Sequence, residues 1–302
     1  MSETRAIATE ATAESRGAGG AGAGAAALHD DLPPLDAPQS LAARTGAALL
    51  RLLARTAITV AVIVVIVLLW WAIVEVFNLP STELPPPSTV WDDLTGKWGI
   101  IWAQATPTII ESVAGYLISA AIGIPLGYVI SRPGPIARSM NTGAVALQIF
   151  PKIAVAPLFL VWFGFGYAPR ILFIVLMSFF PIALNAAAGF ASVPLDLQDL
   201  GSIVGMGWLT RIRKLQGPWA LPQIFTGLKI AASFAVIAAL VSEFSGGTQG
   251  LGVLIVQLEA NLDISLMFAA ILMVTVLGFV FYGLISVLEM IAIPWHVSRR
   301  RQ

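Results

Sequence analysis

The stretch Ile58–Phe77 reads ITVAVIVVIVLLWWAIVEVF and carries one charged residue, Glu75. A helix that crosses a bilayer needs about 20 mainly apolar residues, and this stretch meets that length. The rest of the chain has the same character: of 302 residues, 57% are hydrophobic and 11% are charged, and the mean hydropathy is +0.84. Such a composition is too apolar for an ordinary soluble domain and indicates an integral membrane protein.

Six windows of the chain are long and apolar enough to span a membrane. They lie at about residues 57–77, 107–131, 140–163, 170–191, 224–245 and 266–291. We therefore expect an all-α, polytopic protein with six transmembrane helices in a domain over residues 46–296. Residues 1–45, which include the low-complexity run Gly17–Ala27, are expected to form a disordered tail, and residues 297–302 a basic C-terminus. The first apolar run begins too deep in the chain for a signal peptide and is expected to remain as a helix.

The cations predict the orientation, because Lys and Arg accumulate on the cytoplasmic side of membrane proteins. With the N-terminus inside, most cations fall in cytoplasmic segments: Arg44, Arg51, Arg55, Arg132, Arg138, Arg211, Arg213, Lys214, Arg299, Arg300 and Arg301. The opposite face keeps Lys97 and Arg170. Both termini and the loop at residues 192–223 are therefore expected to be cytoplasmic. Residues 78–105 are expected to form a cap or short interfacial helix outside. Residues 246–264 are amphipathic and too short to cross, and are expected to form an exoplasmic or re-entrant segment.

The loop at residues 192–223 is unusually long for a connection between two spans. Pro194 favours a helix start, and the sequence Gly205-Met206-Gly207 favours a break into two short helices. Met206, Trp208 and Leu209 would then form an exposed apolar knob beside three cations. Two interpretations fit this pattern: a knob that docks into a groove of a soluble partner, or an interfacial helix whose tryptophans lie among lipid headgroups.

An ionisable residue lies within the predicted third span. Lys152 stands between Pro151 and Pro157, each of which removes a backbone donor and favours a bend. A charge at that depth is costly and by default indicates a cavity or a pathway. Lys152 is therefore a candidate pathway residue that would suit an anionic solute; alternatively it pairs with Glu111 or Glu243, or extends its ammonium toward water.

Other polar and aromatic residues within or at the ends of the spans are further candidates for a translocation pathway. Glu243 ends the fifth predicted span and suits either a gate or a carboxylate that reaches water at a helix end. The others either line a cavity or make contacts between helices, and they are Gln148, Ser178, Asn185 and Phe234. The glycines Gly115, Gly123 and Gly127 share one helix face and predict a close approach to a neighbouring helix.

Several chemistries are excluded by the residues that the chain lacks. A phosphate-binding loop needs Gly-x4-Gly-Lys-Ser/Thr, whereas the only Gly-Lys pair is Gly96-Lys97, followed by Trp98. The chain has no Cys and two His, so we expect no metal centre, no cofactor and no His-based nucleophile on it. The net charge of zero suggests no nucleic-acid partner.

Five stretches of the chain together resemble the permease subunits of ABC importers of the nitrate/sulfonate/taurine group. They are LPPPSTVWDDL at Leu84–Leu94, GIPLGYVISR at Gly123–Arg132, FPKIAVAPLFLVWFGFG at Phe150–Gly166, GTQGLG at Gly247–Gly252 and the loop at residues 192–223. In that loop Gly205 stands at the glycine of the family signature. Asp199-Leu200-Gly201 replaces the usual Glu-Ala-Ala, and Gly217-Pro218 replaces Leu-Pro.

The resemblance implies a type I ABC importer permease fold in the cell inner membrane. It implies a second permease copy, two cytoplasmic ATPase subunits that hold the ATP and magnesium, and an external binding protein. The coupling loop would use Asp199, Gly205, Met206, Gly207, Trp208 and Leu209. Members of the group import nitrate, sulfonates, or compounds like riboflavin and thiamine-precursor pyrimidines. The alternative to an ATP-driven permease is a self-sufficient secondary transporter or channel that uses Lys152, Glu111 and Glu243.

Overall fold

The computed structural model describes residues 41–132 and 134–294, and every regular element in this part of the chain is helical. The chain divides into two units between Ile63 and Val64, and the described portion of the first unit is the start of helix α3. The long helices are α3 (Leu41–Phe77), α5 (Trp98–Ile130), α8 (Tyr167–Ala191), α11 (Gly217–Phe244) and α13 (Ile264–Ala292). The shorter ones are α4 (Pro87–Gly96), α6 (Pro135–Ile149), α7 (Ala156–Phe163), α9 (Leu195–Ile203), α10 (Trp208–Arg211) and α12 (Leu251–Ala260).

The all-helical prediction is confirmed, and the described residues contain five helices long and apolar enough to cross a membrane. These segments are Val60–Phe77, Trp98–Ile130, Tyr167–Ala191, Trp208–Phe244 and Ile264–Ala292. Helix α3 begins at Leu41, inside the segment predicted as a tail. The rest of that tail, and the basic C-terminus predicted at residues 297–302, lie outside the described residues.

The third predicted span, residues 140–163, does not form one continuous helix. Helix α6 ends at Ile149, a 3-10 turn covers Lys152–Val155, and α7 begins at Ala156. Pro151 has no N–H to donate, so the helix cannot continue through it without losing a backbone hydrogen bond. Pro157 lies in the first turn of α7, where proline is tolerated because that N–H has no intrahelical partner. The two prolines therefore interrupt the helix around Lys152.

Helices α5, α8 and α11 pack closely because glycines lie at their crossing points. A Cβ added to Gly127 of α5 would lie 2.5 Å from the Cβ of Ala186 on α8. A Cβ added to Gly189 of α8 would lie 2.7 Å from the carbonyl oxygen of Ala220 on α11. Small residues let membrane helices approach until their backbones touch. The predicted close-approach face on α5 is confirmed, and its partner is α8.

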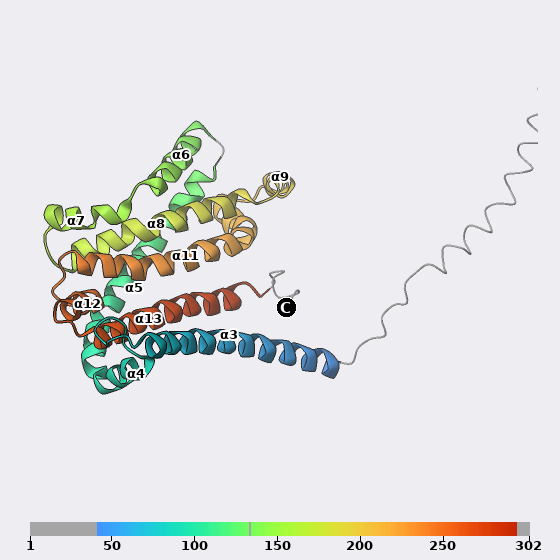
Figure 1. The fold of residues 1–302 in the computed structure, drawn as a ribbon. Coiled ribbons are helices and arrows are strands. Elements are labelled where there is room, and N and C mark those ends of the chain that lie inside the picture. Colours follow the sequence, from blue (N-terminus) through green and yellow to red (C-terminus); the bar gives the residue numbers. More distant parts are fainter. Residues whose placement is uncertain (1–40, 133, 295–302) are drawn as a thin grey trace, which may run out of the picture. The chain divides into compact units, whose positions relative to one another are not determined.

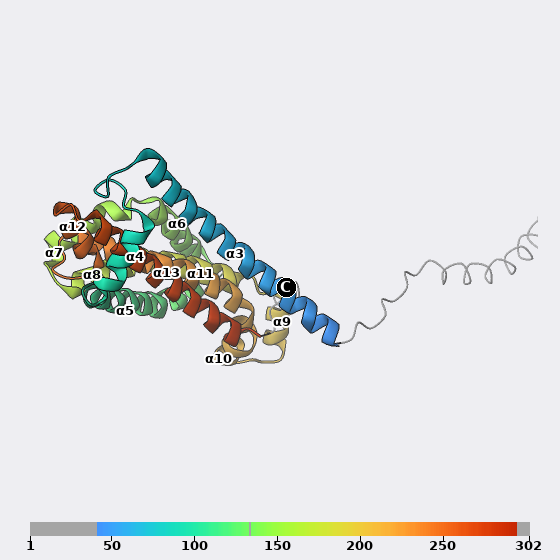
Figure 2. The same ribbon diagram turned by 60° about the horizontal axis from the view of Figure 1, so that its bottom comes forward.

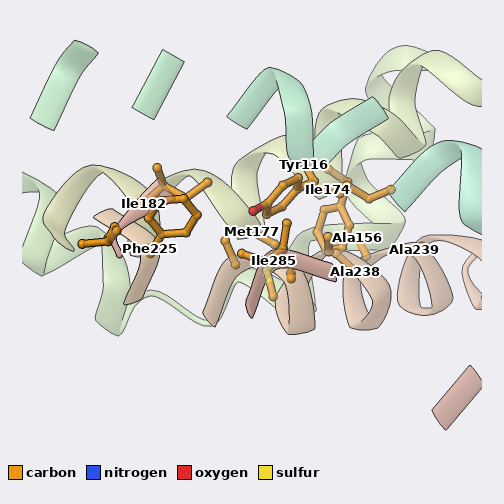
Figure 3. Packing of buried hydrophobic residues seen from close by; sticks show 14 residues of the cluster. Tyr116, Ala156, Ile174, Met177, Ile182, Phe225, Ala238, Ala239 and Ile285 are labelled. Carbon is orange, nitrogen blue, oxygen red and sulfur yellow. The ribbon is translucent and has the colours of Figure 1, made fainter. Parts of the chain in front are cut away.

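A buried apolar cluster fills the space between these helices (Figure 3). Tyr116 of α5 packs edge-on against Phe281 of α13, with ring centroids 4.9 Å apart. Met177 of α8 and Ile285 of α13 belong to the same cluster, and α11 contributes alanines such as Ala238. The cluster holds α5, α8, α11 and α13 together in one helical body.

Figures 1 and 2 show that α9 lies at one end of α8 and α11, whereas α7 and α12 lie at the other end. The chain order explains this placement, because α9 follows the C-terminus of α8 and α12 follows the C-terminus of α11. Helix α4 lies in the segment predicted to be a cap or short interfacial helix, and α12 lies in the segment predicted to be too short to cross. The two ends of the helical body therefore carry different features, a polar loop at one and a buried charged network near the other.

Candidate functional site

A cavity of about 650 Å³ lies where the interrupted third segment meets α8 and α11. Its lining combines aromatic and aliphatic side chains with one ammonium and one amide: Phe150, Pro151, Lys152, Ile153, Met177, Pro181, Asn185, Ile230 and Phe234. Three of the predicted pathway residues, Lys152, Asn185 and Phe234, thus lie around one cavity. Concave sites with mainly apolar walls and a few polar groups are typical of small-molecule binding.

Lys152 is half-buried at this cavity, and its ammonium lies 4.7 Å from the ring centroid of Phe180. That geometry is a cation–π contact. No carboxylate of the described residues lies within ion-pair distance of the ammonium, and Glu111 pairs elsewhere. The interpretation that Lys152 pairs with Glu111 or Glu243 is therefore wrong for this structure. Its amino group thus contacts an aromatic ring and no carboxylate of the described residues.

The remaining predicted pathway residues lie elsewhere. Ser178 is fully buried and donates to the carbonyl of Ala231, 3.4 Å away, so it joins α8 to α11. Glu243 lies in the buried network described below. The side chain of Gln148 lies outside the described residues. Asn185 also donates to the carbonyl of Pro181 at 2.8 Å, which fixes the amide at the cavity wall.

Arg170 and Glu111 form a buried ion pair between α8 and α5. Arg170 Nη1 lies 2.8 Å from Glu111 Oε1, and the side chains are 2% and 0% exposed. The sequence predicted Arg170 at the external face, a position that stays a prediction; the structure adds that the first turn of α8 directs its side chain inward. Pairing of the two charges reduces the cost of burying either one.

Glu243 lies in the same network and is 1% exposed, so it does not reach water at the helix end. Its Oε1 accepts a hydrogen bond from Thr108 Oγ1 at 2.7 Å, and its Oε2 accepts one from Gly252 N at 2.6 Å. Thr108 Oγ1 also accepts from Leu251 N at 2.9 Å. The carboxylate thus lies at the N-terminus of α12, where unpaired backbone amides and the helix dipole favour a negative charge.

The network also fixes the loop that leads into α12. Gln104 Oε1 accepts from Gly250 N at 2.8 Å, and Arg170 Nη1 donates to the carbonyl of Gln249 at 3.2 Å. Gln249 in turn donates to the hydroxyl of Tyr167 at 2.8 Å. Gly250 has a φ of +122° and its Cβ would collide with the Glu243 carboxylate, so no other residue fits there. The GTQGLG segment therefore supplies the backbone groups that the buried side chains of this network bind.

Sequence reasoning missed Arg170 as a member of this network. Its position beside Pro169 at the start of an apolar window resembles that of a loop residue. The available signal was charge balance, because Glu111 and Glu243 lay in predicted spans and needed a buried cation.

The loop at residues 192–223 forms two short helices, α9 and α10, as predicted. Gly205 adopts a φ of +68° in the turn between them, a conformation that favours glycine. Trp208 and Leu209 are 63% and 57% exposed, whereas Met206 is half-buried. Asp199 is exposed on α9. A π-helical turn at Ile212–Gln216 then leads directly into α11.

The exposed surface of this loop combines apolar and basic side chains. Ile203 and Val204, at the end of α9, are 82% and 65% exposed. Arg213 and Lys214 are exposed on the π-helical turn, and Arg211 lies beside α9 with its guanidinium 2.8 Å from Ser202 Oγ. Apolar residues exposed next to cations are typical of a protein-binding surface or a lipid-headgroup contact.

Comparison with known proteins adds independent evidence. Residues 119–290 match the family model described as "Binding-protein-dependent transport system inner membrane component". A probable ABC transporter permease of Haemophilus influenzae is 30% identical over 215 residues, which cover 71% of this chain and 88% of that protein. The riboflavin transport system permease of Chloroflexus aurantiacus is 29% identical over 76% of this chain and 86% of its own length.

Among solved structures, the inward-facing MetNI methionine ABC transporter contains a chain that superposes with a TM-score of 0.52. The identity is 18%, and the match covers 63% of this chain and 97% of that chain, so the likeness concerns the fold. Taken together, the match over residues 119–290 and the relatives that cover most of the chain place this multi-pass membrane protein in the family of binding-protein-dependent transport system inner membrane components, as an ABC importer permease for small solutes.

Proposed function

We propose that this permease carries a small anion through the cavity at Lys152, driven by partner ATPases that dock on the loop at residues 192–223. The cavity is the observation that carries the proposal. It lies between α8, α11 and the interrupted segment around Pro151, and its ammonium has no partner carboxylate among the described residues. A cation held in an apolar wall attracts an anion more strongly than it would in water, because the local dielectric constant is lower.

The names of relatives agree with a range of small solutes. Relatives of this chain include permeases named for aliphatic sulfonates in Bacillus subtilis, for taurine in Escherichia coli and for riboflavin in Chloroflexus aurantiacus. The Lys152 ammonium favours the anionic members of that range, a sulfonate or nitrate, over a neutral ring compound. The apolar residues Phe150 and Phe234 favour a solute with a carbon body.

A second copy of the permease would complete the cavity. Phe150, Ile153 and Ile230, which line it, are 51%, 54% and 42% exposed in the single chain. Within a bilayer an ionisable group is costly next to lipid, so a second copy that covers these side chains would shield the Lys152 amino group from lipid. We therefore propose a homodimer whose two cavities meet at the interface, so that the solute passes between the copies.

The loop at residues 192–223 would place the ATPase on the cytoplasmic side, in accord with the distribution of Lys and Arg. The partner ATPases would bind the ATP and magnesium. When the ATPases close on ATP, they would bring together the loops of the two permease copies and open the helices outward. An external binding protein would then deliver the solute. ATP hydrolysis would restore the inward-facing state. Gly205 and Gly207 give the loop its turn, and Trp208 and Leu209 give it an exposed apolar surface.

The contacts of the buried acids argue against the alternative, a secondary transporter that uses Lys152, Glu111 and Glu243. Glu111 is paired with Arg170, and Glu243 accepts two hydrogen bonds at the N-terminus of α12. Neither carboxylate lines the Lys152 cavity. The three side chains therefore do not line a common path in this structure.

Co-purification tests the proposed docking. The full-length chain, expressed with its cognate ATPase, should retain the ATPase through purification in detergent, and deletion of Gly205–Leu209 should release it. Retention by the deletion variant would contradict docking on this loop.

The solute itself is best identified by thermal-shift screening of the cognate binding protein, in which sulfonates and nitrate should raise the melting temperature. A rise with neutral compounds alone would contradict the anion assignment.

A further inference from the structure

One side chain of the coupling loop contacts α5, a helix that does not adjoin the loop in the sequence. The loop continues directly from α8 and into α11, whereas α5 lies far away in the sequence. Trp208, the first residue of α10, donates its indole N–H to the hydroxyl of Tyr128 on α5 at 3.0 Å. The two rings lie at an angle of 63°, with centroids 6.5 Å apart.

Tyr128 is fixed from two further directions. The ring of Phe190, near the end of α8, packs edge-on against it at a centroid distance of 5.1 Å. The guanidinium of Arg132, just after α5, lies 4.4 Å from the centre of the Tyr128 ring. Such aromatic and cation–π contacts restrict the orientation of the ring. The hydroxyl is therefore presented to the loop from a fixed position.

The glycine-containing turn between α9 and α10 lies beside this contact. Gly205 has a φ of +68°, and Gly207 comes directly before Trp208. A Cβ added to either glycine would meet nothing within 4 Å, so no neighbouring side chain presses on the glycines themselves. Within the loop, Arg211 Nη2 donates to Ser202 Oγ at 2.8 Å, and Met206 N donates to the carbonyl of Gly201 at 2.9 Å. These contacts stay inside the loop, whereas the Trp208 indole reaches α5.

We infer that Tyr128 is a positioning residue for coupling: its hydrogen bond to Trp208 transmits displacement of the ATPase-docking loop into α5. Helix α5 packs tightly against α8 at Gly127, next to Tyr128 in the sequence, so displacement passes to the body that lines the Lys152 cavity. This inference rests on the proposed ATPase docking. It adds a route through α5 to the covalent routes through α8 and α11.

The test compares transport with ATP hydrolysis in proteoliposomes that contain the whole importer. Tyr128→Phe removes the hydroxyl and keeps the ring, so the contacts with Phe190 and Arg132 remain. One hydrogen bond contributes about 0.5–1.5 kcal/mol, which corresponds to a fall of about 2- to 10-fold in solute transported per ATP hydrolysed. Trp208→Phe should give a similar fall, and the double variant no more than either single variant, because both changes remove the same contact.

Tyr116→Phe is the matched control. Tyr116 lies on the same helix and also packs edge-on against a phenylalanine, but its hydroxyl has no hydrogen-bond partner among the described residues. This variant should leave the ratio of transport to hydrolysis unchanged. If Tyr128→Phe also leaves it unchanged, or if Tyr128→Phe releases the ATPase, the inference is wrong. Failure of the unmodified chain to bind an ATPase would instead contradict the proposed function.

Discussion

The guanidinium of Arg170 lies 2.8 Å from the carboxylate of Glu111, and both side chains are almost completely shielded from solvent. This ion pair connects α8 to α5, and Arg170 also donates to the carbonyls of Gly166 and Gln249. Removal of one member of a buried pair leaves the other charge without compensation, which costs more than removal of both. The pair is therefore a structural constraint on the helical body that contains the cavity.

Arg170→Gln should destabilise the protein by about 3–5 kcal/mol, because it leaves the buried Glu111 carboxylate without its cation. The double variant Glu111→Gln/Arg170→Gln should recover part of that loss. The measurement is the thermal-unfolding midpoint of the purified protein in detergent. A double variant whose loss equals the sum of the two single losses would show that the charges do not interact.

Thr108→Val should cost about 1–3 kcal/mol, because Thr108 Oγ1 donates to Glu243 and accepts from Leu251 N, and valine leaves both groups unsatisfied. Thr106→Val is the control on the same helix. Thr106 is exposed and its hydroxyl bonds only the carbonyl of Trp102 in its own helix, so this change should stay within about 0.5 kcal/mol. The measurement is the thermal-unfolding midpoint of each variant. Equal losses of stability in the two variants would contradict a bridging role for Thr108.

Gly127→Ala should destabilise the contact between α5 and α8 by about 1–3 kcal/mol, because the new Cβ would lie 2.5 Å from the Cβ of Ala186. Gly99→Ala is the control on the same helix, since a Cβ there meets nothing within 4 Å and alanine has the higher helix propensity. Its melting temperature should stay equal or rise. A Gly127→Ala protein as stable as the parent would mean that the helices are further apart.

Lys152→Met should lower transport of an anionic solute about tenfold or more, since an interaction with a charged group contributes about 1.5–3 kcal/mol. Lys152→Arg keeps the charge and should retain more transport than Lys152→Met. Co-purification with the ATPase should be unchanged in both variants, because Lys152 lies at the cavity and not on the coupling loop. Loss of assembly in the methionine variant would assign a structural role to Lys152 instead.

Local sequence signals predicted the elements that depend on local chemistry. The apolar windows identified the helices, and the glycines of α5 identified its close-packed face, because steric size acts at each position separately. Gly205-Met206-Gly207 predicted the turn between α9 and α10 for the same reason: its backbone requirement is local. The prolines around Lys152 predicted a bend, and the structure shows a full interruption, since Pro151 removes the donor where α6 ends.

The buried network could not be predicted in the same way, because it depends on which helices meet. Arg170, Glu111 and Glu243 are separated widely in the sequence and come together only when α5, α8 and α11 pack. Likewise, the contact between Trp208 and Tyr128 joins residues 80 positions apart. Lys152, Asn185 and Phe234 line one cavity because α11 packs alongside α8 in the folded chain. Their role in transport remains a prediction.

Uptake of solute into proteoliposomes distinguishes an ATP-driven permease from a transporter driven by an ion gradient. The full-length chain is reconstituted with its cognate ATPase and binding protein, or alone, and uptake is followed with ATP or with an imposed proton or sodium gradient. We predict uptake only with the ATPase, the binding protein and ATP together, and none by the chain alone under either gradient. Uptake by the chain alone, driven by an ion gradient, would contradict this prediction.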